Sequence, residues 1–474
     1  MTRSTPVRPR RAALLLALLT GACASVPHLG PAAVSRAPAL QAEAHVLDGT
    51  AGEWPADGWW QSYGDTQLTQ LVSEALAHSP DLEAATARIR AADGYAKQAG
   101  AALLPSITAS ASANEMLLSK NNGVPAQIVP GGWNDTGTAT LGLNFDLDLW
   151  GKNRANLRAA KIESAAARYD AAQARLAVTT GIAAAYAELA ALYAQRDSLE
   201  AALEIRTQTL KLVDQRVTQG LDNEAARRQA SARLAATRAN LVATDEAIAL
   251  AKNAIAALIG NGPDRAATIT RPALEFLAVQ PLPSNAAIDL LGRRPDIIAA
   301  RTRAEAAAQQ VKAARAEFYP NVSLTALAGY QAFGLDNLFK SNSSFGAAGP
   351  AVSLPIFRGG ALQGQYRTKR GQYDEAIALY DHQIIEALHQ TADAMTSRAL
   401  LVSRLAESRS ALADFEEANR LARLRYSQGL STYLDVLTAE EGVLDSRLTV
   451  ARLQTRAFAL DVALVRALGG GFHA

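Results

Sequence analysis

Few side chains in this sequence have the types and spacing that a catalytic or metal-binding site requires. His382, Glu386 and His389 recur at helical intervals and could turn two imidazoles and a carboxylate toward one metal ion. An isolated trio of this kind is far more often a solvated helix face, so we predict no metal site and no cofactor. The sequence also contains no G-x-S-x-G, no H-E-x-x-H and no P-loop, and its GNG at residues 260–262 follows a helical stretch instead of a strand. These observations argue against an enzyme.

A covalent modification is predicted near the N-terminus. Four arginines precede a short apolar run at residues 12–19, which is the pattern of a secretory signal and not of a membrane-spanning helix. The residues TGA then lead to Cys23, the sole cysteine, in a pattern that resembles a bacterial lipobox, whose cysteine receives lipid such as palmitate after cleavage. Ala24, in place of aspartate, favours the outer membrane by the same resemblance. The alternative is an ordinary signal peptide with an incidental cysteine.

The overall composition favours long helices packed side by side. Of the 474 residues, 49% are apolar, but alanine supplies most of the excess and aromatic residues make up only 6%. Lysine and arginine number 47 against 45 aspartates and glutamates, and a net charge of +2 gives no indication of a nucleic-acid partner. No apolar run reaches the ~18 residues that a membrane-spanning helix needs, so none is predicted.

The chain contains an internal repeat, which divides it into domains. Pro80 matches Pro295 and Pro105 matches Pro320, both at an offset of 215 residues. Further on, RVTQGL in the first copy returns as RYSQGL in the second, and LDLWGK lies opposite LPIFRG. We predict a signal peptide at residues 1–22, a lipid-anchored extended tether at 23–57, a first repeat at 58–264, a linker at 265–284 and a second repeat at 285–470.

Each repeat predicts two strands whose faces differ in character. The strands expected at residues 106–114 and 138–149 alternate apolar residues with hydroxyl, amide and carboxylate residues, and the second repeat has counterparts at 322–330 and, more weakly, 345–354. Such strands can cross a bilayer when tilted, with one face toward lipid and the other toward water. Four strands cannot close a barrel, because known barrels begin at about eight, so several chains would have to share one. The alternative is a soluble four-stranded sheet with one wet face.

Long helices follow each pair of strands. Residues 152–219 and 361–428 contain no proline, and a helix of that length would extend for roughly 100 Å. Gly220 and Gly429 then stand where a left-handed residue would end the helix and turn the chain back. Shorter return helices are expected at residues 224–259 and 432–468. Helices of these lengths form coiled-coil hairpins or a wall instead of surrounding one compact core.

Six motifs carry a resemblance to a known family. They are WWQSYGDTQLTQLVSEAL, LDLWGK, LLGRRPDIIAAR, FYPNVSL, GPAVSLPIFRGG and RYSQGLSTYLDVLTAEE, and they extend over nearly the whole mature chain. With them the sequence resembles the TolC-like outer membrane factor family, and within it the NodT-type lipoproteins of resistance-nodulation-division efflux systems. The resemblance implies a mixed, mainly α fold. In it, three chains each give four transmembrane strands to one twelve-stranded β-barrel, which a periplasmic α-barrel of coiled-coil helices continues.

The same resemblance implies a gate where the helical hairpins turn. Asp435 corresponds to an acidic gate residue, Tyr426 to an aromatic residue that holds the closed state by hydrogen bonding, and Ser431 to a position where relatives carry a charge. We expect the Tyr426 hydroxyl and nearby arginines to partner Asp435. Further candidates, chosen from their place beside the turns, are Asp222, Arg216 and Arg425. The alternative for each of these residues is a capping or surface-pair role.

LDLWGK and LPIFRGG would be the passages from strand to helix. Glycine would allow the change of direction there, and an aromatic residue in each passage would lie near the membrane interface. The residues of these passages are Trp150, Gly151, Phe357, Gly359 and Gly360.

The resemblance favours one function over two others. It implies a passive duct in the outer membrane that extends into the periplasm, docks a periplasmic adaptor protein and an inner-membrane pump, and exports small molecules such as drugs. A type I protein-secretion duct is the alternative within the family. A lipid-anchored periplasmic coiled-coil scaffold without a pore is the alternative from another class.

Overall fold

The computed structural model describes residues 26–36, 54–121, 123, 125, 127–273 and 292–473. The lipidation predicted at Cys23 lies outside the described residues, as do most of the predicted tether and part of the predicted linker. The described residues form two compact units. Unit 1 takes them from Met1–Ser35, Ile89–Ala167 and Ala300–Tyr380, and unit 2 from Arg36–Arg88, Arg168–Ala299 and Asp381–Ala474. Each unit therefore draws on both sequence repeats.

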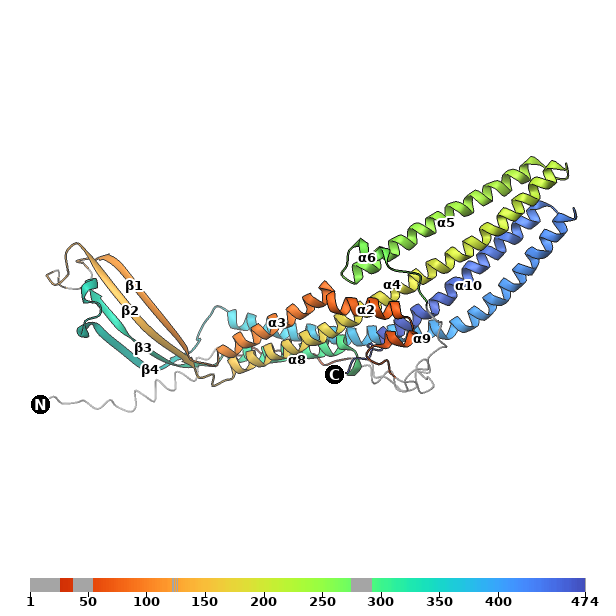
Figure 1. Cartoon of the computed structure of the whole chain (residues 1–474). Helices are drawn as coiled ribbons and strands as arrows, with labels where there is room; N and C mark the ends of the chain where they lie inside the picture. The colour runs from red at the N-terminus through yellow and green to blue at the C-terminus, as the bar shows by residue number, and fades with distance from the viewer. Residues whose placement is uncertain are drawn as a thin grey trace. The chain divides into compact units, whose positions relative to one another are not determined.

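Unit 1 contains a four-stranded antiparallel sheet in the order β1-β2-β3-β4 (Figure 1). The strands are β1 (Ser106–Leu117), β2 (Trp133–Asp146), β3 (Asn321–Phe333) and β4 (Ser344–Ser353). The pairing of β2 with β3 joins the two repeats, with Leu143 opposite Ala326 and Asn144 opposite Thr325. The four predicted strands are present, although β2 begins five residues before its expected start at residue 138, and β1 and β4 form the two edges of the sheet.

The two faces of the sheet differ as the alternation predicts. Leu143 lies between Ile107 and Ala326 on one face. On the other face the hydroxyls of Ser110 and Thr140 are 2.8 Å apart. Every residue of β1 and β4 is exposed, so the sheet has an apolar face but buries no core of its own. An exposed apolar face of this kind needs lipid or further protein to cover it.

β2 ends earlier than the alternation suggests. Leu147 and Leu149 continue the apolar pattern, yet the strand stops at Asp146. Asp148 adopts a φ of 45°, and its carboxylate accepts hydrogen bonds from the backbone N–H groups of Asn153 and Arg154, at 2.8 and 2.9 Å. The side chain of Asp148 therefore caps the next helix, and the chain must leave the sheet to reach it.

The helices repeat in length as well as in order (Figure 1). The first repeat gives α3 (Pro80–Ala101), α4 (Lys152–Thr218) and α5 (Glu224–Leu258). The second gives α8 (Pro295–Ala316), α9 (Ala361–Ser427) and α10 (Tyr433–Ala467). Matching helices have 22, 67 and 35 residues in both copies, which confirms the predicted long helices and their return helices. Shorter elements are η1 (Trp59–Tyr63), α2 (Thr66–His78), α6 (Pro263–Ala267), η2 (Leu335–Asn337) and η3 (Ser341–Ser343).

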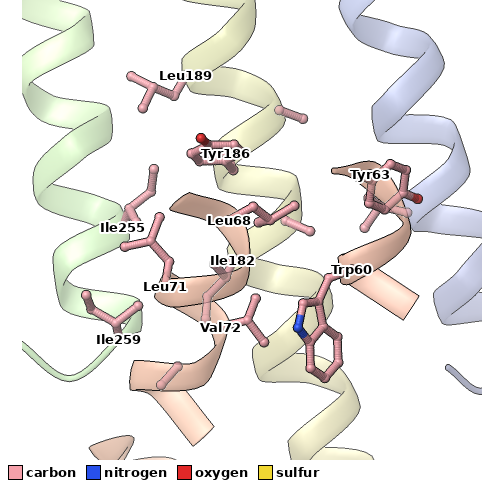
Figure 2. Close-up of a cluster of buried hydrophobic side chains, with 14 of the residues drawn as sticks. Trp60, Tyr63, Leu68, Leu71, Val72, Ile182, Tyr186, Leu189, Ile255 and Ile259 are labelled. Atoms are coloured by element: carbon pink, nitrogen blue, oxygen red, sulfur yellow. The ribbon is translucent and has the colours of Figure 1, made fainter. Parts of the chain in front are cut away.

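Unit 2 has its main hydrophobic core where η1 and α2 pack against the long helices (Figure 2). Leu68, Leu71 and Val72 follow helical spacing on α2 and are completely buried. Asp65 caps α2, because its Oδ1 accepts the N–H of Leu68 at 2.9 Å, and its Oδ2 accepts the hydroxyl of Tyr186 on α4 at 2.8 Å. The WWQSYGDTQLTQL motif therefore builds this core.

α4 owes its apolar character to the same core. It is the one helix in the described ranges that is long and apolar enough to cross a membrane, judged by length and composition alone. Its residues Ile182, Tyr186 and Leu189 are completely buried in the cluster that Figure 2 shows. Around these three residues, packing against α2 and α5 accounts for the apolar stretch of α4.

Candidate functional site

The candidate site lies at two turns of unit 2, where α4 passes into α5 and α9 passes into α10 (Figure 1). Gly220 and Gly429 have φ of 72° and 80°, so the predicted left-handed glycines are confirmed. In the first turn the N–H of Leu221 donates to the carbonyl of Arg216 at 2.9 Å, and in the second the N–H of Leu430 donates to the carbonyl of Arg425 at the same distance. Both turns are Schellman motifs with the same backbone geometry.

The buried side chains between these turns form one hydrophobic cluster, called the tip cluster below: Val213, Ala226, Ala230, Tyr426, Tyr433, Val436 and Leu437. All four helices contribute to it, so the two repeats are packed together here. Tyr426 is the most deeply buried aromatic residue of the cluster, with 1% of its surface exposed. Its ring centroid lies 6.2 Å from that of Tyr433.

The hydroxyl of Tyr426 donates a hydrogen bond to Oδ2 of Asp222 at 2.5 Å. Tyr426 belongs to the second repeat and Asp222 to the first, so this bond joins the two turns. The guanidinium of Arg216 lies over the Tyr426 ring at 4.6 Å from its centroid and donates weakly to the carbonyls of Leu221 and Ser427, at 3.4 and 3.5 Å. Burial, and then the bond to Asp222, raise the pKa of Tyr426. The phenol therefore stays protonated and remains a donor.

Asp435 has a different partner from the expected one. Its Oδ2 accepts the backbone N–H of Thr432 at 2.9 Å, which is its half of a capping box at the start of α10, and it also accepts the Thr432 hydroxyl at 3.0 Å. These bonds, and to a lesser degree Arg425, lower the pKa of Asp435. The Tyr426 hydroxyl bonds Asp222, whereas Asp435 bonds Thr432 in the first turn of α10.

The other two candidates in the second turn, Arg425 and Ser431, take no part in the contacts around Tyr426. Arg425 is exposed to solvent. Ser431 is half-buried, and its hydroxyl oxygen is shielded from solvent without a hydrogen-bond partner among the described residues. The structure thus brings together Tyr426, Asp222 and Arg216 from the predicted set, with Asp435 beside them in a capping role.

A buried polar group deeper in the same helices was not foreseen from the sequence. Glu440 on α10 has 5% of its surface exposed, and its Oε1 accepts the hydroxyl of Thr209 on α4, which is also buried. Burial raises the pKa of the Glu440 carboxyl. Tyr433, Val436 and Glu440 follow helical spacing, so a glutamate that continues an apolar stripe is the sequence signal that could have revealed it.

The two passages from strand to helix lie in unit 1 and differ from each other. In the first, Trp150 donates its indole N–H to the carbonyl of Pro320 at 2.7 Å and stacks on Tyr319, with ring centroids 4.8 Å apart. Gly151 has a φ of 76°, as a left-handed turn requires. In the second passage, 86% of the surface of Phe357 is exposed.

Gly359 and Gly360 complete the second passage. Their φ values are 57° and 85°, and a Cβ placed on either would lie in open space. Both predicted passages therefore turn at left-handed glycines, but the first alone is also tied by an aromatic side chain.

The histidine-containing face of α9 makes an ordinary surface contact. His389 Nε2 lies 3.4 Å from Oδ2 of Asp393, and both side chains are well exposed. Across the described ranges, no three side chains of the metal-binding types gather closely enough to hold an ion.

Comparison with known proteins gives concordant matches along the chain. The model of the outer membrane efflux protein family matches residues 71–261 and 287–470. The fusaric acid resistance protein FusA of Burkholderia cepacia is 36% identical over 368 residues, which are 75% of this chain and 68% of FusA. The multidrug resistance outer membrane protein MdtQ of Escherichia coli O157:H7 is 28% identical over 98% of both chains.

Solved structures match equally well. The crystal structure of the outer membrane protein VceC of Vibrio cholerae superposes with a TM-score of 0.83 at 48% identity, covering 89% of this chain and all of that one. The outer-membrane channel OprN superposes with a TM-score of 0.81 at 26% identity, covering 95% of this chain and 99% of that one.

Proposed function

The chain belongs to the outer membrane efflux protein family, and we propose that it forms a passive homotrimeric duct that the tip cluster holds closed. As a family member it is an efflux channel of the outer membrane, mainly helical with a small antiparallel sheet. FusA and MdtQ are named for resistance to fusaric acid and to multiple drugs. By that likeness the cargo of this duct is small toxic molecules.

The sheet supports a shared barrel. Its edges, β1 and β4, have no further strand beside them in the described part of the chain, and open strand edges are not tolerated in hydrocarbon. Three copies of four strands give twelve, which is above the smallest known barrels of about eight. The apolar row around Leu143 would then face outer-membrane lipid, and the hydroxyl row around Thr140 would face water.

Three further parts of the proposal come from the family and from the sequence. By likeness to the family, a periplasmic adaptor and an inner-membrane pump would supply cargo and energy. Cys23 would anchor the N-terminus to the membrane by lipid. Nothing in the balanced charge of the chain favours a nucleic-acid partner.

The hydrogen bond from Tyr426 to Asp222 is the observation that best supports a gate at the tip cluster. It joins the turn of one repeat to the turn of the other inside the buried tip cluster, and Arg216 covers the same ring. A hydrogen bond to a charged acceptor is stronger than a neutral one, so its loss should loosen the contact between the two hairpins. Duct opening requires such a loosening where the hairpins of three chains converge.

The test compares two tyrosines of the tip cluster. Tyr426→Phe removes the hydroxyl that bonds Asp222, whereas Tyr433→Phe removes a hydroxyl that makes no hydrogen bond to other described residues. We expect Tyr426→Phe to raise the single-channel open probability of purified protein in a planar bilayer, in the absence of a pump, and Tyr433→Phe to leave it near the parent value. Equal behaviour of the two variants, with normal trimer yield, would contradict the gate.

The same recordings separate the alternatives. A protein that trimerises but never conducts, even as Tyr426→Phe, would be a scaffold and not a duct. Drug susceptibility of cells that carry the gene and its variants would distinguish drug efflux from protein secretion.

A further inference from the structure

We propose that Glu440 is a proton-responsive positioning residue of the tip, which favours the joined arrangement of the two hairpins when its carboxyl is protonated. This inference deepens the proposed gate and rests on it. Glu440 was not among the residues that the resemblance indicated, and its hydrogen bond to Thr209 is separate from the one between Tyr426 and Asp222.

Burial and geometry single Glu440 out from the glutamate beside it. Glu440 is 5% exposed and accepts a hydrogen bond from Thr209, which is 1% exposed. Glu441 has an exposed side chain and forms an ordinary ion pair with Arg233 of α5 at 2.8 Å. Since Thr209 belongs to the first repeat and Glu440 to the second, the carboxyl is enclosed only while the two hairpins are packed together.

The cations around Glu440 are engaged elsewhere. Arg206 of α4 donates to the hydroxyl of Thr237 and to the carbonyl of Arg233. Arg423 of α9 donates to the side chain of Gln208 at 3.2 Å. Both arginines favour the ionised carboxylate through their charge, but neither forms an ion pair with Glu440 in the part of the chain that the structure describes.

The remaining charged and titratable neighbours do not neutralise Glu440 either. From α5, Arg233 is paired with Glu441. On α10 itself, burial, followed by the charge of Glu440, raises the pKa of Tyr433 to about 12, so this phenol is neutral throughout the physiological range. An ionised Glu440 would therefore be a buried carboxylate that is supported by the Thr209 hydroxyl and by the charges of two arginines that form no ion pair with it among the described residues. Such a group is costly to keep charged.

The sign of the pH effect follows from this placement. Burial raises the pKa of Glu440 above its ordinary value of 4.5 in the joined arrangement, and the Thr209 bond and the two arginines oppose that shift without cancelling it. When the hairpins separate, water reaches the carboxyl and its pKa falls back. The protonated group therefore stabilises the joined arrangement fully below the ordinary pKa, and that stabilisation is lost as pH rises through the raised value.

The first measurement is open probability in planar bilayers between about pH 4.5 and 8, with Tyr426→Phe as the parent so that openings are frequent. We expect acidification to lower the open-to-closed ratio, by up to about tenfold for each pH unit by which the two pKa values differ. In this parent, Glu440→Gln should remove the pH dependence and hold the channel at the low ratio, because the amide is neutral at every pH. The matched Glu441→Gln should keep the parent's pH dependence.

A second variant and a second readout keep the proposal falsifiable if Glu440→Gln assembles poorly. Thr209→Val removes the hydroxyl donor that favours the carboxylate, so closure on acidification should shift to higher pH. The thermal midpoint of the helical signal should fall with rising pH in the protein with its natural tip residues, and Glu440→Gln should flatten that slope.

The outcomes distinguish the two proposals. If Tyr426→Phe fails to raise the open probability, the proposal that the tip cluster is the gate is wrong, whatever the unfolding data show. If it raises conductance but Glu440→Gln and Glu441→Gln give the same pH slopes in both readouts, the gate stands and the role of Glu440 is overturned.

Discussion

The two tip turns share one backbone and differ in their side chains. Each ends a 67-residue helix at a left-handed glycine with the same Schellman hydrogen bonds. At matching positions, however, Arg216 lies over an aromatic ring whereas Arg425 is exposed, and Asp222 accepts a hydrogen bond whereas the Ser431 hydroxyl has no partner among the described residues. The repeat therefore fixes how the chain turns, and divergence between its copies fixes how the turns are held together.

The largest difference in stability is expected between variants of Asp222 and of Ser431, its counterpart in the other turn. Asp222→Ala leaves the Tyr426 hydroxyl buried without its charged acceptor, at a cost of about 1.5–3 kcal/mol to the packed tip. Ser431→Ala removes a shielded hydroxyl that has no partner, so stability should stay unchanged or rise slightly. Chemical unfolding of the purified protein in detergent measures both variants. Equal losses would break the comparison.

The glycines should behave alike, because the backbone is what the turns share. Gly220→Val and Gly429→Val each force a β-branched residue to adopt positive φ, which costs roughly 1–2 kcal/mol. A Cβ at Gly220 would meet nothing within 4 Å, and one at Gly429 would only touch Arg216 at 4.0 Å, so sterics add little. The same unfolding experiment applies, and a difference of more than about 1 kcal/mol between the two would show that the turns are not equivalent.

A smaller contrast is expected between the two arginines. Arg216→Met removes the cation from the Tyr426 ring and should cost about 1 kcal/mol. Arg425→Met alters an exposed side chain and should change stability by less than about 0.5 kcal/mol. A double variant of Arg216→Met with Tyr426→Leu serves as the control, since the arginine should lose its effect once the ring is absent.

The smallest expected effect is the loss of helix capping in acid at the first turn of α10. Asp435 caps α10 with a lowered pKa, so its contribution is present above the ordinary value of 3.8 and is lost as pH falls through the lowered one. Asn223 caps α5 by accepting the N–H of Ala226 at 3.0 Å and does not titrate, but Glu224 in the same turn has a pKa lowered by its bond to Arg227 and loses its charge in acid as well. Asp435→Asn is therefore the reference: on strong acidification, hydrogen exchange in the first turn of α10 should rise more in the parent than in this variant. An equal rise in both proteins would remove Asp435 from a role in the capping box.

The sequence allowed the backbone of the tip to be predicted but not its contacts. Glycine after a long helix, with an apolar residue following, indicates a Schellman turn from local chemistry alone. The bond between Tyr426 and Asp222 joins residues 204 positions apart, and Ser431 at the matching place of the other repeat gives no hint of it. Asp435 was expected to partner Tyr426, whereas its spacing from Thr432 equally fits the capping box that the structure has.

The same division holds in unit 1. Period-two alternation located three strands clearly, because one face of each strand is apolar and the other polar, and it indicated the glycine-rich fourth strand more weakly. It carried the second strand too far, since the apolar pattern continues through Leu147 and Leu149 while the Asp148 carboxylate caps α4. The pairing of β2 with β3 across the repeats was not predicted either, because register between distant strands depends on packing that a local pattern does not contain.

A double-mutant cycle on channel opening tests the central claim most directly. Tyr426→Phe, Asp222→Ala and the double variant are compared with the parent by open-to-closed ratio in planar bilayers without a pump. If the bond between the two turns holds the duct closed, either single change should favour opening. The double variant should open hardly more than either single variant, which corresponds to a coupling of about 1–3 kcal/mol. Additive effects of the two changes, or no opening by either, would contradict it.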